Sequence, residues 1–333
     1  MAVLKTKIMK NIAVVAGGNS SEYVISVQSG KMLVDEIRKA GYNTFLIEIR
    51  YDEWNAVIDD KTIIPIDRGC FEFEYKGEKI KFDCIVIAIH GTPGEDGRLQ
   101  SYFDLVKIPY ISCGVFSSVM TFNKYACKIF LKDQGIKSAP AILLNKKTKY
   151  NTDYIIQEIG LPCIVKPNES GSSFGVSKID KKENLENAIN EAFTESEDVI
   201  VEKFIKGIEV TCGMVNLNGE DIVFPITEVV SKKEFFDYEA KYTTGMSEEI
   251  TPARISVSIE KKIKETTSQI YHALRCKGIT RTDYIISNDE VYFLEVNTIP
   301  GMSPHSIIPK QLKTMNIAVS DIYNKMIEES LKR

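Results

Sequence analysis

The chain lacks the features that mark secreted, membrane and nucleic-acid-binding proteins. No apolar run approaches the ~20 residues of a membrane-spanning helix. The first residues, MAVLKTKIMKN, lack the apolar core and cleavage site of a secretory signal. The net charge of −4 gives no sign of a nucleic-acid or membrane surface. We therefore expect a cytoplasmic protein that has neither nucleic acid nor membrane as a partner.

Cysteine pairs and two common nucleotide-binding motifs are also missing. The seven cysteines include no CxxC pair and lie mostly in apolar segments, which is typical of reduced, buried thiols. The loop after the first strand-like run is not GxGxxG, which disfavours a dinucleotide-dependent oxidoreductase. The chain also has no GxxxxGK[ST] loop, so any phosphate site must be built differently.

What the first third does have is an alternation of strand-like and helix-like segments. Apolar runs typical of strands occur at 11–18, 43–49 and 84–89. Helical spacing begins at about Ser26 and recurs over 97–106. This alternation predicts a parallel, doubly wound, Rossmann-like sheet over residues 1–119.

The remaining two thirds predict mixed elements. A single helix is expected over 117–134, and Asn218-Gly219 predicts a hairpin turn. Further strands are expected at 141–144, 162–167 and 199–204, and a long helix at 259–277. We expect two more domains, at 120–212 and 213–333, so that the fold class is α/β together with α+β.

The most informative pattern is a second hairpin, formed by the alternating runs 281–287 and 291–301. They are joined by Asn288-Asp289-Glu290, which is turn-prone. Because side chains alternate along a strand, each run presents its polar residues on one face.

Four polar residues of this hairpin predict a metal site. Arg281 and Asp283 share one face, and Glu295 and Asn297 share another. If the faces coincide, three oxygen donors and a guanidinium meet, and such donors suit Mg²⁺. The alternative is a solvated face with a cross-strand ion pair. Glu295 favours the metal, because it lies in the apolar FLEVN, where an unpaired carboxylate is costly to bury.

Two lysines and a Gly/Ser loop are candidates for binding phosphate. Lys166 ends an apolar strand and is followed by the loop 168–175, whose backbone N–H groups and hydroxyls could cradle phosphate oxygens. A flexible turn beside a surface lysine is the alternative. Lys124 lies in a predicted helix, where most lysines are merely solvated.

Three charged residues surround a short loop after another strand. Glu202, Lys203 and Glu209 could contact a nucleoside, or they could form an ordinary charged loop.

Two loops lie where open α/β sheets bind ligands, beyond the carboxyl ends of parallel strands. The loop 17–26 contains Glu22, which could bind an ammonium group or complement a helix dipole. The loop 90–97 begins with His90, which could serve a ligand or cap a helix. The aromatic segment 235–245 is either a packed cluster or part of a lid over 231–252 that excludes water.

Taken together, these segments resemble the D-alanine–D-alanine ligases, which are members of the ATP-grasp superfamily. The resemblance runs from about residue 11 to the C-terminus. It rests on an ordered set of motifs: AGGNSSE, HGTPGEDG, IVKPNESGSSFGVSK, VEKF…IE, FDYEAKY, RTDY and EVNTIPGMSPHS. It implies an ATP-grasp fold that follows the N-terminal Rossmann-like domain.

The resemblance also implies a role for each candidate residue. ATP would be bound by Lys124, Lys166, Ser173, Glu202, Lys203, Glu209 and Lys241. Two Mg²⁺ ions, or Mn²⁺, would be bound by Asp283, Glu295 and Asn297. The first D-alanine would be held by Glu22 near His90, and the carboxylate of the second by Ser306. Glu22, Ser172 and Tyr242 would form a hydrogen-bonded trio that closes the lid. Arg281 and the N–H of Gly301 would stabilise the tetrahedral oxyanion.

The implied activity is the ATP-dependent joining of two D-alanines through an acyl phosphate, for peptidoglycan precursors, by a homodimer. D-lactate or D-serine as the second substrate is the alternative, although Tyr242 argues against D-lactate. Another ATP-grasp ligase and a non-catalytic nucleotide-binding regulator are weaker alternatives. The chain departs from the family pattern at Asn123, where Asp is common, and at Ser170 and Phe174 in the phosphate loop.

Overall fold

The computed structural model describes residues 9–171, 174–231 and 247–332. Its contacts divide the chain into two compact units. The first contains residues 1–115, 217–220 and 301–333, and the second contains 116–216 and 221–300. The three-domain division expected from the sequence, at 119 and 212, stays a prediction. None of the helices in the described ranges combines the length and apolar character that crossing a bilayer requires.

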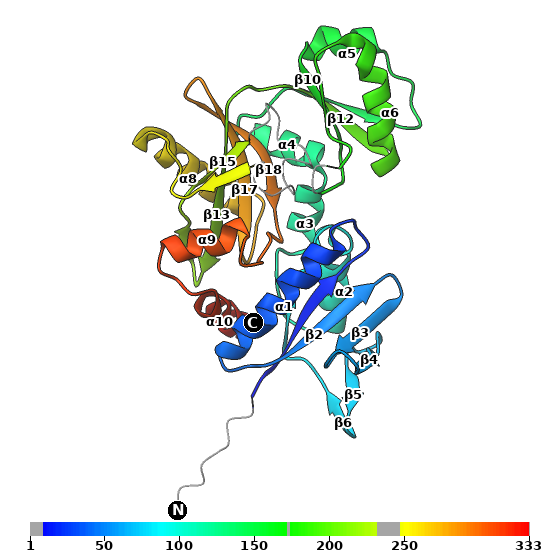
Figure 1. The fold of residues 1–333 in the computed structure, drawn as a ribbon, viewed down its shortest axis with the longest axis vertical. Coiled ribbons are helices and arrows are strands. Elements are labelled where there is room, and N and C mark those ends of the chain that lie inside the picture. The colour runs from blue at the N-terminus through cyan, green and yellow to red at the C-terminus, as the bar shows by residue number, and fades with distance from the viewer. Residues whose placement is uncertain (1–8, 172–173, 232–246, 333) are drawn as a thin grey trace, which may run out of the picture. The chain divides into compact units, whose positions relative to one another are not determined.

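The first unit is built on a six-stranded sheet with the strand order β4-β3-β2-β1-β7-β8 (Figure 1). Its strands are β1 (Asn11–Gly17), β2 (Asn43–Arg50), β3 (Glu53–Val57), β4 (Ile63–Pro65), β7 (Cys84–Ile87) and β8 (Tyr110–Ile111). The pairs β1–β2, β1–β7 and β7–β8 are parallel, as predicted. β3 and β4 extend the edge in antiparallel fashion, and β5 (Phe73–Tyr75) pairs with β6 (Glu78–Ile80).

Helices cover both faces of this sheet, which confirms its doubly wound character. The helices of the unit are α1 (Tyr23–Lys39), α2 (Arg98–Val106), α9 (Ile307–Thr314) and α10 (Val319–Ser330). α1 approaches closely because Gly30 lies against Ala16 of β1 and Leu46 of β2. Phe45 points to the other face, where a chain of aromatic contacts through Phe82 and Phe71 reaches Phe103 of α2.

The second unit contains two antiparallel sheets. The first has the order β11-β10-β12-β9, and the second has the order β16-β15-β13-β17-β18 with β14 paired to β13. Their strands are β9 (Ala141–Asn145), β10 (Cys163–Pro167), β11 (Ser177–Ile179), β12 (Asp198–Lys203), β13 (Ile208–Leu217), β14 (Glu220–Val223), β15 (Thr227–Ser231), β16 (Ser247–Ile250), β17 (Thr280–Ser287) and β18 (Glu290–Asn297). The helices are α3 (Val115–Phe122), α4 (Lys124–Asp133), α5 (Thr152–Ile159), a 3₁₀ turn η1 (Lys182–Asn184), α6 (Leu185–Glu195) and α8 (Val257–Ala273).

The first sheet of this unit packs one of its faces against helices. Val165, Val199 and Val201 pack against Ile155 of α5 and Ile189 of α6. Because side chains alternate along each strand, Lys166 of β10 and Glu202 of β12 are turned to the opposite face, away from the helices. This second face combines the buried apolar Ile164 and Ile200 with the charged Lys166 and Glu202.

Both predicted hairpins are present, and the second has a shorter turn than expected. Asn218 and Gly219 have φ angles of 51° and 87°, as a tight hairpin turn requires. Asn288 and Asp289 have φ angles of 51° and 59° and form a two-residue turn, so Glu290 belongs to β18. β18 ends at Asn297, four residues before the end of the predicted run.

The single helix predicted over 117–134 is wrong, because the chain forms α3 and α4 with a break at Asn123. The backbone of Asn123 is extended, and its side-chain oxygen accepts a hydrogen bond from the N–H of Ala126 at 2.9 Å. Its amide nitrogen donates to Glu169 at 2.7 Å. Helix capping and a contact from a distant loop thus override the continuous helical spacing.

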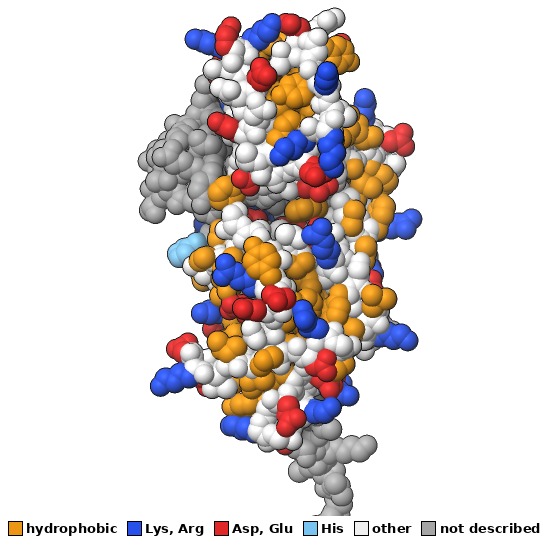
Figure 2. Space-filling model, turned by 90° about the vertical axis from the view of Figure 1, so that its right-hand side faces the viewer, with side chains coloured by type: hydrophobic (Ala, Val, Ile, Leu, Met, Phe, Trp, Pro, Cys, Tyr) orange, Lys and Arg blue, Asp and Glu red, His pale blue; other side chains and the backbone are white. Residues whose placement is uncertain are grey.

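The surface charges and the cysteines can be compared with the sequence analysis. On the face in Figure 2, Lys and Arg side chains are interspersed with Asp and Glu, without a broad patch of one sign. All seven cysteines are free thiols, and only Cys70 is exposed.

Asn123→Ala should lower the free energy of unfolding by about 1 kcal/mol, because it removes the cap of α4. Asn123→Asp should lower it less, because aspartate also caps helices, although it places a carboxylate against Glu169. Urea unfolding followed by circular dichroism measures both changes. Equal stability of the alanine variant and the unchanged protein would contradict the capping role.

Candidate active site

The register of the hairpin β17–β18 brings four predicted residues onto one face. Arg281 lies opposite Asn297, and Asp283 lies opposite Glu295. Because residues directly opposite each other in an antiparallel pair point the same way, the two polar faces coincide. The predicted site required that the polar residues of the two strands share one face, and they do.

The carboxylate of Asp283 is the centre of this face and accepts four hydrogen bonds. Oδ1 accepts from Thr211 Oγ1 at 2.5 Å and from Arg281 Nε at 2.9 Å. Oδ2 accepts from Arg281 Nη2 at 2.9 Å and from Asn297 Nδ2 at 3.0 Å. The structure does contain an ion pair, but it joins Arg281 to Asp283 of the same strand and differs from the solvated cross-strand pair that the sequence offered as an alternative.

Two features of this network were not predicted. Thr211 comes from β13, where it pairs with Asp283, and nothing near it in the sequence indicates this partner. Burial alone would lower the pKa of Arg281, but the adjacent Asp283 outweighs burial and raises that pKa. The guanidinium is thus held charged and fixed in orientation by a two-pronged contact.

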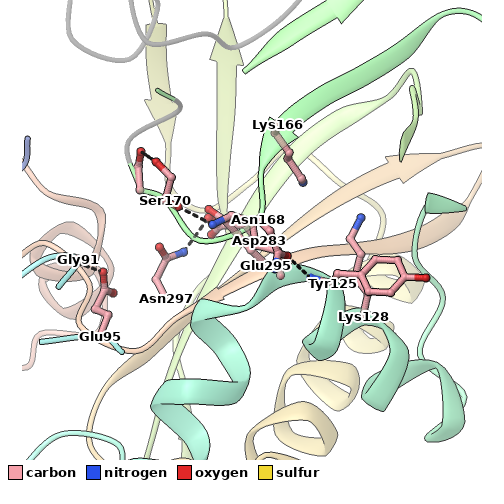
Figure 3. A network of polar contacts seen from close by, with 12 residues as sticks. Gly91, Glu95, Tyr125, Lys128, Lys166, Asn168, Ser170, Asp283, Glu295 and Asn297 are labelled. Carbon is pink, nitrogen blue, oxygen red and sulfur yellow. Dashed lines mark hydrogen bonds and ion pairs between the residues drawn. The ribbon is translucent and has the colours of Figure 1, made fainter. Parts of the chain in front are cut away.

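Glu295 connects the hairpin to the start of α4. Its Oε2 lies 3.7 Å from Lys124 Nζ, and Lys124 also donates to the backbone oxygen of Ser170 at 2.5 Å. Lys124 is therefore not a freely solvated helical lysine. It contacts both the hairpin and the Gly/Ser loop, which lie together in Figure 3 around the labelled Ser170, Asp283 and Glu295.

Asn168 anchors the Gly/Ser loop to the same helix and was not predicted. It is fully buried, and its Oδ1 accepts from the N–H of Tyr125 at 2.9 Å. Its backbone oxygen accepts from the N–H of Lys124 at 3.2 Å. Its Nδ2 has no partner among the described residues. The loop and the first turn of α4 are thus fixed to one another.

Three buried charged residues lie next to this region: Lys166 and Glu202, on the face of the sheet β11-β10-β12-β9 that is turned away from its helices, and Lys128 of α4. Lys166 Nζ is 2.7 Å from Glu202 Oε1, and Lys128 Nζ contacts Glu202 Oε2. Burial raises the pKa of Glu202, but the two lysines outweigh it and lower the pKa to about 2. Sequence reasoning missed Lys128, although its place one turn after Lys124 was a signal.

The other predicted nucleoside residues lie around the end of β12 and the start of β13. Lys203 is exposed, and strand alternation turns its side chain away from the face of Glu202. Its backbone N–H donates to Pro140 at 2.9 Å. Glu209 lies near the start of β13, between Val229 and Ile285 of the neighbouring strands.

The predicted amino-acid-binding residues lie in the first unit, in the loops that follow the adjacent strands β1 and β7. Ser20 Oγ donates to the backbone oxygen of His90 at 2.8 Å and so joins the two loops. A Cβ at Gly91 would lie 3.8 Å from Glu22 Oε2, so the Glu22 carboxylate faces the second loop. Gly91 is further held by its N–H, which donates to Glu95 at 2.7 Å.

Gly301 and Ser306 belong to the same unit and are tied to these loops through Ser29. Ser29 Oγ lies 3.4 Å from His90 Nε2 and accepts from the N–H of Met302 at 3.2 Å. Ser306 precedes the first residue of α9, so it stands at a helix N-terminus, which favours anions. Its hydroxyl is 2.8 Å from that of Ser303.

Four predicted residues lie outside the described residues: Ser172, Ser173, Lys241 and Tyr242. The same is true of most of the predicted lid, 231–252.

Comparisons with known proteins agree over nearly the whole chain. The family model for the D-Ala–D-Ala ligase N-terminus matches residues 11–113, and that for the C-terminus matches 130–328. The D-alanine–D-alanine ligase of Phocaeicola vulgatus is 48% identical over 320 residues, which cover 96% of this chain and 98% of that protein. The solved structure of D-alanyl-alanine synthetase A from Vibrio cholerae has a TM-score of 0.87 at 26% identity, covering 98% of this chain and 99% of that one.

A second solved structure is similar, that of the VanG D-Ala:D-Ser ligase from Enterococcus faecalis. Its TM-score is 0.84 at 33% identity, and the match covers 97% of this chain and 99% of that one. The resemblance found in the sequence is thereby confirmed. The chain belongs to the D-alanine–D-alanine ligase family and has the ATP-grasp fold.

Proposed function

We propose that the chain joins two D-alanines to D-alanyl-D-alanine at the expense of ATP. The reaction passes through an acyl phosphate and releases ADP and phosphate. The observation that carries this proposal is the meeting of Asp283, Glu295 and Lys124 with the loop after β10. Carboxylates, a lysine and a loop of backbone donors are what transfer of a phosphoryl group needs.

The residues assigned to ATP form two sets, one for its phosphates and one for its adenosine. Lys124 and Lys166 supply positive charge for the phosphate oxygens, and the loop from Asn168 supplies backbone donors. Glu202 and Glu209 line the adenosine, together with the backbone of Lys203, whose side chain is turned away from the face of Glu202. Because Asn168 fixes the loop to α4, Lys124 and the loop keep one relative geometry.

The donors of the hairpin fit a divalent cation. Asp283, Glu295 and Asn297 offer hard oxygen atoms, which Mg²⁺ and Mn²⁺ prefer. No group of three or more His, Cys, Asp and Glu side chains with metal-binding geometry occurs within the described ranges. The proposed set therefore has two carboxylates, with the amide of Asn297 as its third donor. Asn297 contacts Asp283 through its nitrogen, and its side-chain oxygen accepts no hydrogen bond from the residues that the structure describes. When two such ions are bound, they neutralise charge on the phosphate oxygens.

The amino acids are assigned to residues of the first unit, with Arg281 acting at the reacting carbon. Glu22, near His90, pairs with the ammonium of the first D-alanine, and Ser306 at the start of α9 binds the carboxylate of the second. The carboxylate of the first D-alanine attacks the γ-phosphorus and ADP leaves. The free amine of the second then attacks the acyl carbon, a proton is lost from nitrogen, and phosphate leaves.

Arg281 and the N–H of Gly301 stabilise the oxyanion that forms in the second step. The contact with Asp283 suits Arg281 to this role, because it keeps the guanidinium charged and oriented before substrate arrives. We further expect the protein to act in the cytoplasm as a homodimer that supplies the dipeptide to peptidoglycan synthesis.

Phosphate release from ATP in the presence of Mg²⁺ tests the activity. D-alanine should support release with formation of the dipeptide, whereas L-alanine should not. D-alanine with D-lactate or D-serine, analysed by mass spectrometry, identifies the second substrate. The D-serine arm matters because one similar structure is that of a D-Ala:D-Ser ligase. No release with D-alanine alone would refute the proposal.

Glu295→Gln should raise the Mg²⁺ concentration that gives half-maximal turnover by at least about tenfold, because a charged oxygen donor is lost. Glu290→Gln is a matched control, since Glu290 lies on the same strand and pairs with Lys262 at 3.1 Å. Titration of turnover with Mg²⁺, together with Mn²⁺ binding by electron paramagnetic resonance, measures the effect. An unchanged Mg²⁺ requirement and Mn²⁺ affinity in the Glu295 variant would remove Glu295 from the metal site.

A further inference from the structure

Lys128, Lys166 and Glu202 form a buried group with unequal charges. Only 3% of Lys128, 6% of Lys166 and 3% of Glu202 is exposed, so solvent screens their charges little. One carboxylate lies between two ammonium groups, with Lys166 on Oε1 and Lys128 on Oε2. The low pKa of Glu202 keeps this carboxylate an anion at neutral pH.

Two ammonium groups and one carboxylate leave one positive charge in excess, and a buried excess charge is costly. Burial and the nearby Lys166 lower the pKa of Lys128, and the contact with Glu202 opposes them, so this carboxylate is what stabilises the buried ammonium. The neighbouring Lys124 and Glu295 form a separate pair that adds no net charge. A buried excess of one positive charge stabilises an anion bound beside it.

We propose that Lys128 is a positioning residue that neutralises Glu202 and thereby leaves the charge of Lys166 for a phosphate group of ATP. This inference rests on the proposed function, in which Lys166 binds phosphate. Without Lys128, Glu202 and Lys166 would form a neutral pair, and the site would lose its net attraction for phosphate. Lys128 itself touches no substrate in this scheme.

The position of Lys128 on α4 supports this role. It follows Lys124 by one helical turn, so both ammonium groups come from one side of the helix. Lys124 reaches Ser170 in the phosphate loop, while Lys128 reaches β12. Figure 3 shows Lys128 and Lys166 on the elements that flank Asn168. One helix thus supplies a lysine for the phosphate loop and a second for charge balance.

Calorimetric titration with two fragments of ATP, inorganic tripolyphosphate and adenosine, tests the proposal without turnover. Lys128→Met should weaken tripolyphosphate binding about tenfold, because Glu202 would then neutralise Lys166 and its charge-assisted contact with phosphate would be lost. It should leave adenosine binding within about twofold, since methionine keeps the apolar stem and Glu202 stays paired with Lys166. Lys132→Met, an exposed lysine one turn further along α4, should change neither.

The double variant Lys128→Met with Glu202→Gln separates charge balance from packing. It removes one charge of each sign and restores the excess at Lys166, so tripolyphosphate should bind more tightly than to the single Lys128 variant. A purely structural role predicts further weakening instead, and that result would overturn the proposal. Unchanged tripolyphosphate binding in Lys128→Met would also overturn it.

Failure of the proposed function gives a different result. In that case the unchanged protein would bind neither ATP nor tripolyphosphate, and the charge-balance role would fall with it. Thermal unfolding of each variant shows whether a loss of binding accompanies a loss of fold.

Discussion

The pairing register of β17 and β18 is the constraint on which the nucleotide end of the chain depends. A slip of one residue would turn Glu295 and Asn297 to the face opposite Asp283, because side chains alternate with a period of two. The two-residue turn at Asn288 and Asp289, with both φ angles positive, fixes the pairing only as far as Tyr284 and Phe293. A one-residue register shift between Asp283 and Tyr284 then brings Glu295 opposite Asp283. The four-fold hydrogen bonding of Asp283 fixes it at the other. Fold and chemistry are thus determined by the same contacts.

Several charged side chains around that hairpin are buried in ion pairs. Each buried ion has a partner of opposite sign: Arg281 has Asp283, and both Lys166 and Lys128 have Glu202. Removing one member of such a pair lowers stability more than replacing both with apolar residues, because the other charge stays buried without a partner. Pairing of this kind prepares the site for a highly charged substrate, since little must reorganise when the phosphates arrive.

The sequence predicted the parts of the fold and site that depend on local periodicity. Strand alternation placed Arg281 and Asp283 on one face, and turn chemistry located both hairpins. Local periodicity could not reveal that Thr211 pairs with Asp283, 72 residues later, or that Lys128 pairs with Glu202, 74 residues later. Strand register and helix docking select these partners. The break at Asn123 was missed for the same reason, since the contact with Glu169 lies outside any helical window. The resemblance to the family supplied roles that spacing alone left open.

The return of residues 301–333 to the first unit affects how the chain is made. α10 packs on α1 and β8 with Ile322, Met326 and Ile327 buried. The ribosome therefore releases the whole second unit before the first unit can bury this apolar surface. During synthesis the surface of α1 and β8 that α10 covers stays exposed until the C-terminal residues are made, whereas all residues of the second unit are already present. The first unit, to which most of the early residues belong, can therefore be completed only after the second unit has been synthesised.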